Sequence, residues 1–261
     1  MNTSAFRVDS LISCIRTSTN PQVHNRTLLL LSELARFAPN LILNHVMPIF
    51  TFMGSNVLRQ DDDYTAHVIE QTIKTVVPML MTDRASALGI TPIIAAFVNN
   101  FDFIPKHRRL SLFRVLMETV GAEEFLSTTL FLLAEKTCET KNKEKSSASE
   151  FGSDLVKSFP LSTRLAAVDS FLRMIMFIPR DPNEIVESLP VELGTYSVSK
   201  LGSLKKECLA IVAGELRSQS FQGAVSRIRD AGDVSNEVFS SILEKLLLVR
   251  ADSDGMTFWG V

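Results

Sequence analysis

Cysteine, tyrosine and tryptophan are scarce in this chain of 261 residues, which contains three Cys, two Tyr and one Trp. The three cysteines, Cys14, Cys138 and Cys208, lie far apart along the sequence. Their odd number and wide spacing fit neither a disulfide framework nor the closely paired ligands of a structural zinc site. We therefore expect a reducing, intracellular compartment.

An excess of charge of one sign is also missing. The chain has 27 Lys and Arg against 29 Asp and Glu, so its formal net charge is -2. Dedicated nucleic-acid binders are strongly basic, which this chain is not. Any binding of nucleic acid would have to come from a local patch.

The chain has no long hydrophobic run without interruption. Residues 37–58 carry no formal charge, but Pro39, Pro48 and Gly54 interrupt the segment, together with several Asn and His residues. A membrane-spanning helix needs about 20 consecutive apolar residues. The polar start of the sequence, with Asp9, also lacks the basic and apolar regions of a secretory signal. We expect a soluble chain without a membrane contact.

Motifs that carry catalytic or metal chemistry are absent from the sequence. Residues 152–158 end in Lys-Ser, but Val156 stands where a phosphate-binding loop requires glycine. No Gly-x-Ser-x-Gly elbow is present, and no histidine belongs to a metal-binding pattern. The four histidines are His24, His45, His67 and His107. The sequence predicts a protein that is not an enzyme, with no cofactor, no metal and no small-molecule substrate.

Apolar residues recur at helical spacing along most of the chain. The repeating sets are Val23, Leu30, Leu34 and Phe37; Ile69, Ile73, Val76 and Leu80; Leu110, Phe113, Met117 and Val120; and Leu161, Leu165, Val168, Leu172 and Ile175. Each set predicts one buried stripe on a helix, and sustained strand-like alternation is hard to find. The predicted fold class is all-α.

Helix starts recur at regular intervals. They are marked by Asn20-Pro21, the run Asp61–Asp63, Pro105 and Pro160, because Pro and acidic residues favour the first helical turn. The intervals are about 40, 44 and 55 residues, and the last falls to about 41 without a charged insertion of about 14 residues. This period predicts an α-solenoid of HEAT-type antiparallel helical hairpins.

We expect residues 1–261 to form a single solenoid segment with one irregular insertion. The segment at about 139–152, ETKNKEKSSASEFG, is polar and rich in Lys and Ser. Such a composition buries too little apolar surface to order itself, so it predicts a disordered loop. After about residue 180 the helical pattern continues with an uncertain repeat register.

A basic cluster stands at the start of the helix predicted after Pro105. It consists of Lys106, His107, Arg108, Arg109 and Arg114. These residues are candidates for contact with phosphate or with an acidic partner. The alternative, which we favour, is a structural role in which an Arg pairs with acidic residues of the adjacent repeat. Arg26 and Arg164 occupy similar places and support that alternative.

The acidic run Asp61–Asp63 has two interpretations. Its carboxylates complement the positive end of the helix that they begin, so a cap is sufficient to explain them. Contact with a basic tail of a partner is the second interpretation.

Three segments carry a resemblance to a known family. The residues HVMPIFTFMG from His45, the stretch Asp61–Val76 and PKHRRLSLFRVLMETVG from Pro105 resemble the large HEAT-repeat scaffold proteins of the small-subunit processome. The resemblance covers about residues 20–140 and implies that the chain is an internal piece of a longer solenoid.

The resemblance also implies a function. The family is nucleolar and acts in ribosomal RNA processing and ribosome biogenesis, with other processome proteins as partners and with pre-ribosomal RNA or small nucleolar RNA as possible partners. None of its residues is catalytic. Two alternatives stay open: a solenoid that contacts RNA phosphates, and an unrelated HEAT adaptor such as a nuclear-transport component.

Overall fold

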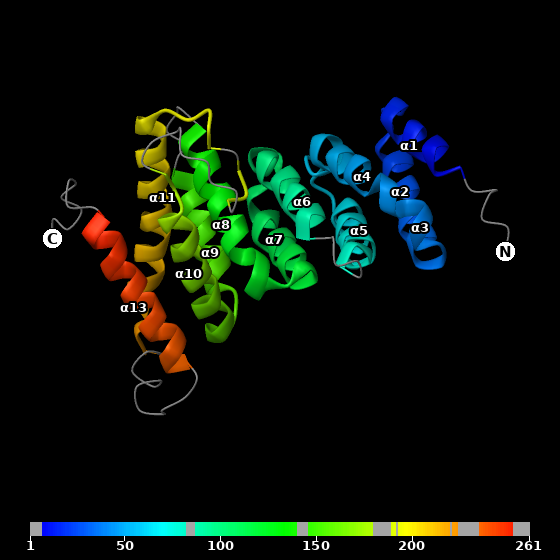
Figure 1. Cartoon of the computed structure of the whole chain (residues 1–261). Coiled ribbons are helices and arrows are strands. Elements are labelled where there is room, and N and C mark those ends of the chain that lie inside the picture. The colour runs from blue at the N-terminus through cyan, green and yellow to red at the C-terminus, as the bar shows by residue number, and fades with distance from the viewer. Residues whose placement is uncertain are drawn as a thin grey trace. The chain divides into compact units, whose positions relative to one another are not determined.

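The computed structural model describes residues 7–81, 87–139, 146–179, 189–191, 193–219, 221–223 and 235–252 (Figure 1). Every regular element in these ranges is a helix, so the predicted all-α class is confirmed. The chain divides into two compact units, residues 1–121 and 122–261. A single solenoid segment over residues 1–261 stays a prediction.

The first unit consists of two rows of helices. One row contains α1 (Val8–Thr17), α4 (Val46–Phe52) and α6 (Ala87–Asn99), and the other contains α2 (Pro21–Phe37), α5 (Asp63–Met81) and α7 (Lys106–Val120). The short connecting elements are α3 (Pro39–Ile42), η2 (Leu43–His45), η3 (Met53–Val57, a π-helix) and η4 (Phe101–Phe103). Neighbouring helices of each row pack on one another: α1 on α4, α4 on α6, α2 on α5 and α5 on α7.

The helices begin where the sequence predicts them. The Asn20 side chain caps α2 by accepting a hydrogen bond of 2.9 Å from the Gln22 amide, and Pro21 follows in the first turn. The Asp62 carboxylate accepts a bond of 2.8 Å from the Thr65 amide at the start of α5. Pro105 directly precedes α7.

Buried polar pairs between α2 and α5 follow the repeat period. Asn25 donates to the Thr65 hydroxyl at 2.7 Å, and Ser32 donates to the Thr72 hydroxyl at 3.3 Å. Both pairs join residues 40 positions apart. Because the pairs join polar side chains that are buried between two helices, they fix the register of one hairpin on the next.

Phenylalanine fills the space between the two rows. The Phe113 ring of α7 lies 6.5 Å from the Phe97 ring and 6.1 Å from the Phe101 ring, both at steep angles. The predicted stripes on α5 and α7 are buried in the main, although Leu110 is exposed. The predicted stripe on α2 is wrong in part: Leu34 is buried, but Leu30 and Phe37 are exposed.

The described residues of the second unit form five long helices. They are α8 (Ala122–Glu139), α9 (Ser146–Lys157), α10 (Leu161–Met176), α11 (Val198–Leu216) and α13 (Ser235–Asp252). Helix α8 packs on α9, α10 and α11, while α13 packs on α10. The buried Asp169 carboxylate of α10 accepts hydrogen bonds from Ser241 and Lys245 of α13, and from Arg173 of α10 itself.

The predicted disordered loop at about 139–152 is wrong in part, because helix α9 covers its second half. Residues 146–152 belong to this helix, and 140–145 lie outside the described residues. Helix α9 packs on α8 and α11, and Leu155 and Val156 are fully buried. A Cβ atom on Gly152 would lie 3.3 Å from Leu130 and 3.5 Å from Ile211. The polar composition misled the prediction because the apolar residues that dock the helix lie mostly beyond residue 152.

Candidate interaction surface at helices α5 and α7

The basic cluster is divided by the first turns of α7, because its side chains leave the helix in different directions. Arg109 points into the first unit and is buried. Its guanidinium donates to the carbonyl of Ile104 at 3.0 Å and lies 4.1 Å from the centre of the Phe101 ring. Arg109 therefore stabilises the connection between α6 and α7, and only a small part of the Arg109 side chain is exposed.

Arg108 reaches across to the start of α5. Its Nε donates to Asp61 at 2.7 Å and its terminal nitrogen donates to Asp63 at 2.8 Å. His107 lies beside it, with Nε2 3.1 Å from the Asp61 carboxylate. Two residues of the predicted basic cluster are thus paired with two residues of the predicted acidic run.

The electrostatics of this contact follow from its geometry. The hydrogen bond from Arg108 lowers the pKa of Asp61, and the charge of His107 adds to this effect although slight burial opposes it. The same hydrogen bonds, which Arg108 donates to Asp61 and Asp63, raise the pKa of Arg108. The positive charge of Arg108 is therefore largely compensated within the chain.

Asp62 has a separate role. Hydrogen bonds from the side chain and the amide of Thr65 lower the pKa of the Asp62 carboxyl. This arrangement is the cap that the sequence predicts for the start of α5.

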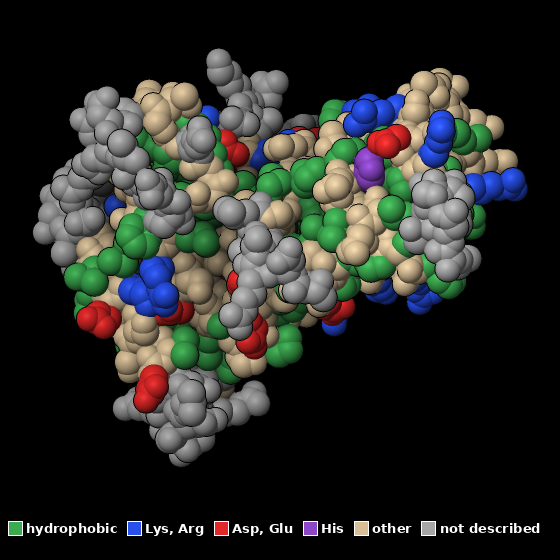
Figure 2. Space-filling view, turned by 45° about the vertical axis from the view of Figure 1, so that its right-hand side comes forward, with side chains coloured by type: hydrophobic (Ala, Val, Ile, Leu, Met, Phe, Trp, Pro, Cys, Tyr) green, Lys and Arg blue, Asp and Glu red, His purple; other side chains and the backbone are tan. Residues whose placement is uncertain are grey.

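The two remaining residues of the basic cluster lie on the surface. Arg114 is exposed and pairs with Glu118 one turn further along α7, at 2.8 Å. Lys106 is exposed and makes no hydrogen bond or ion pair with the residues that the structure describes. In Figure 2, basic and acidic side chains are scattered over the visible face without a continuous basic surface.

The predicted pairing of Arg residues with the adjacent hairpin is found at Arg108 and at Arg164. The buried Arg164 of α10 donates its Nε to Glu215 of α11 at 2.6 Å and a terminal nitrogen to Ser218. Arg26 does not make such a pair. It is exposed on α2 and forms no ion pair within the described ranges.

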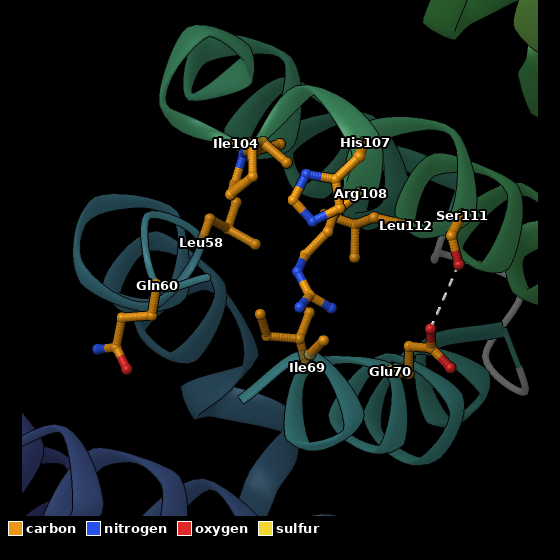
Figure 3. A pocket seen from close by; sticks show the side chains of 11 residues that line it. Leu58, Gln60, Ile69, Glu70, Ile104, His107, Arg108, Ser111 and Leu112 are labelled. Atoms are coloured by element: carbon orange, nitrogen blue, oxygen red, sulfur yellow. Dashed lines mark hydrogen bonds between the residues drawn. The ribbon is translucent and has the colours of Figure 1, made fainter. Parts of the chain in front are cut away.

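A pocket lies between α5 and α7, beside Arg108, and we call it the α5–α7 pocket (Figure 3). It has a volume of about 170 Å³. Its lining consists of Leu58, Gln60, Ala66, Ile69, Glu70, Ile104, Pro105, His107, Arg108, Ser111 and Leu112. Figure 3 shows Arg108 reaching from α7 towards Ile69 of α5, with the hydrogen bond from Ser111 to Glu70 on one side.

Sequence reasoning did not predict this pocket. Its four buried aliphatic residues, Leu58, Ile69, Ile104 and Leu112, come from four separate places in the sequence. The sequence offers one signal, the spacing of 47 and 45 positions from Asp61 and Asp63 to Arg108, which is close to the repeat period. A hollow between helices depends on the size of each facing side chain, which periodicity does not specify.

Metal sites and membrane-spanning helices are two further features that bear on function. Among the residues that the structure describes, no group of three or more His, Cys, Asp or Glu side chains is arranged to hold a metal ion. Within the same residues, no helix is both long enough and apolar enough to span a membrane.

Comparison with known proteins places the chain in a family. A family model described as HEATR1-like, HEAT repeats, matches residues 87–251. A relative from Schizosaccharomyces pombe is 34% identical over 260 residues, which cover 94% of this chain and 15% of the relative. A relative from Yarrowia lipolytica is 44% identical over 179 residues, 65% of this chain and 11% of the relative.

A third relative, from Candida albicans, is 34% identical over 235 residues, 84% of this chain and 13% of the relative. All three bear the name U3 small nucleolar RNA-associated protein 10. The chain therefore spans between 11% and 15% of the length of these relatives. With a family model that covers more than half of it, the chain belongs to the HEATR1-like family of HEAT-repeat proteins.

Proposed function

We propose that this chain is a non-catalytic HEAT-repeat scaffold that acts in assembly of the small-subunit processome, and so in ribosomal RNA processing and ribosome biogenesis. The name of its relatives associates them with the U3 small nucleolar RNA. Stacked helical hairpins present extended surfaces that suit contact with other proteins. Its partners are neighbouring processome proteins, and its location is the nucleus and the nucleolus.

The main support for a protein-binding role is that most residues of the basic cluster are buried or paired within the chain. Arg109 is buried, Arg108 and His107 face Asp61, and Arg114 faces Glu118. Affinity for RNA depends mainly on cations that neutralise phosphates. Except for Lys106, the residues of the cluster already have partners within the chain, so they contribute little to such binding.

Contact with RNA phosphates is the alternative, and Lys106 and Arg114 are the residues that remain exposed for it. The unrelated adaptor, such as a nuclear-transport component, is not favoured, because the relatives share one name and one family.

The salt dependence of RNA binding separates the scaffold from the RNA alternative. A labelled single-stranded RNA is titrated with the purified chain at several salt concentrations, and with the double variant Lys106→Ala/Arg114→Ala. Each phosphate contact that is lost reduces the slope of log affinity against log salt by about 0.7 for single strands. The scaffold role predicts weak binding and an unchanged slope.

The double variant Arg36→Ala/Lys74→Ala is the matched control, because it removes the same charge from exposed positions on α2 and α5. A reduced slope in the first variant alone would support phosphate contact through the basic cluster and contradict the scaffold role.

A further inference from the structure

We infer that the α5–α7 pocket is a docking site for one aromatic side chain of a partner protein, in a segment where Lys or Arg flanks that aromatic residue. This inference rests on the proposed scaffold function and names the chemistry of its partner. It follows from the size of the pocket, its lining and the charges at its mouth.

Size excludes most other ligands. Pockets for substrates and cofactors usually enclose about 300 to 1,000 Å³, whereas this pocket has about 170 Å³. An apolar protein cavity of about 150 Å³ holds one benzene molecule. The α5–α7 pocket therefore has room for one ring or one branched aliphatic side chain.

The inner wall of the pocket favours an apolar group, and the lining also contains the charged residues Arg108 and Glu70. Leu58, Ile69, Ile104 and Leu112 are each less than a tenth exposed, and they provide the inner wall. A nucleobase on this wall would leave its polar edges without hydrogen-bond partners, which costs free energy. A phenyl ring has no such groups.

Arg108 favours an aromatic ring over an aliphatic one. The edge of its guanidinium is already engaged with Asp61 and Asp63, and its side chain is 23% exposed. The planar face of a guanidinium attracts the face of an aromatic ring. The described residues of the same unit include two such pairs, Arg59 over Phe103 at 4.0 Å and Arg109 over Phe101 at 4.1 Å.

The charge at the mouth of the pocket favours Lys or Arg beside the aromatic residue of the partner. Asp61 and Asp63 provide two carboxylates beside the cation Arg108, and the Asp63 side chain is fully exposed. Glu70 in the lining of the pocket adds a third carboxylate. Histidine at position 107 adds positive charge only when it is protonated. The excess of carboxylates attracts a basic segment and repels the phosphates of RNA.

The test uses the tripeptide Lys-Phe-Lys, acetylated and amidated at its ends, and follows the methyl signals of Ile69, Ile104, Leu58 and Leu112 by NMR. We expect saturable shifts of these signals. The peptide Glu-Phe-Glu should bind several-fold more weakly at low salt, and Lys-Ser-Lys should cause no saturable shift. Uridine monophosphate is the nucleotide probe and should leave the signals unchanged.

Two matched variants locate the binding. Ala66→Phe places a ring in the pocket from its own wall and should weaken binding of Lys-Phe-Lys about tenfold or more. His67→Phe adds the same ring at the next position, which is exposed and does not line the pocket, and should bind like the original chain. Ser111→Trp, at the exposed rim, repeats the block in case Ala66→Phe unfolds the unit.

Absence of saturable shifts with Lys-Phe-Lys would overturn this inference, as would equal binding by the blocked variants. Shifts with uridine monophosphate alone would assign the pocket to RNA and overturn it too. The scaffold function is tested separately, by capture of processome proteins with the original chain, so either result leaves that test intact.

Discussion

Neighbouring arginines on α7 differ in what they contribute to stability. Replacing Arg109 by Ala removes its stacking on Phe101 and leaves the buried carbonyl of Ile104 without its donor. An unsatisfied buried acceptor costs about 1 to 3 kcal/mol. We expect Arg109→Ala to lower the free energy of unfolding by that amount in urea denaturation.

Arg108→Ala is the comparison, since it removes only bonds to the exposed Asp61 and Asp63. Exposed ion pairs contribute little to stability. A larger loss for Arg108 than for Arg109 would show that the two side chains have exchanged roles.

A cavity at Phe113 tests the packing between the two rows of the first unit. The Phe113 side chain is fully buried against Phe97 and Phe101. Truncation of a buried Phe to Ala costs about 3 to 5 kcal/mol. We expect that loss for Phe113→Ala, and a change of less than about 0.5 kcal/mol for the exposed Leu110→Ala. Chemical denaturation of both variants gives the comparison.

At the scale of the helix, the sequence predicts starts better than faces. Asn20, Asp62 and Pro105 act locally, within one turn, so their effect on α2, α5 and α7 is read directly from the sequence. The buried face of α2 depends on the neighbouring helices α1, α3 and α5 instead. The four consecutive Leu residues at 28–31 offer several possible phases, and packing selects Leu28 and Leu31 over Leu30.

The candidate site likewise combines features that local sequence predicts with features that depend on packing. The basic cluster and the acidic run were both recognisable from composition, and pairing with an adjacent repeat was predicted in general terms. The different directions of Arg108 and Arg109 were not predicted. Successive residues of a helix point about 100° apart around its axis, so adjacent side chains face different neighbours. One arginine therefore faces α5 and the other faces the interior.

Helix α9 provides a direct test of an element that the sequence misassigned. Gly152 fits closely between Leu130 of α8 and Ile211 of α11. A large side chain at this position forces the helices apart, and overpacking costs about 1 to 3 kcal/mol. We expect Gly152→Leu to lower the thermal unfolding midpoint clearly. An unchanged midpoint would mean that the segment is a surface insertion after all.

The contact between α10 and α13 should depend on pH. Burial alone raises the pKa of Asp169, but hydrogen bonds from Lys245, Ser241 and Arg173 outweigh it, so that the net pKa is lowered below 3.8. A carboxyl with a lowered pKa in the folded state stabilises the fold above its unfolded pKa, and this stabilisation is lost as the pH falls.

Asp169→Asn should therefore weaken the fold at neutral pH and reduce the loss of stability between about pH 5 and pH 2. Unfolding in urea across this range measures the effect. Parallel acid profiles for the two proteins would show that Asp169 is not paired as described.

At the scale of the whole molecule, the helical-hairpin fold and the membership of the HEATR1-like family both support the proposed scaffold function. Paired charges within and between hairpins leave a surface of mixed polarity, and the name of the relatives associates those relatives with the U3 small nucleolar RNA. The central claim is that this chain holds proteins in place and does not hold RNA directly.

Affinity purification of the chain from nuclear extract, divided into samples with and without ribonuclease, tests this claim most directly. Mass spectrometry identifies the captured proteins in each sample. We expect processome proteins to remain bound after ribonuclease treatment. Their loss after that treatment would show that RNA mediates the association and would contradict the account.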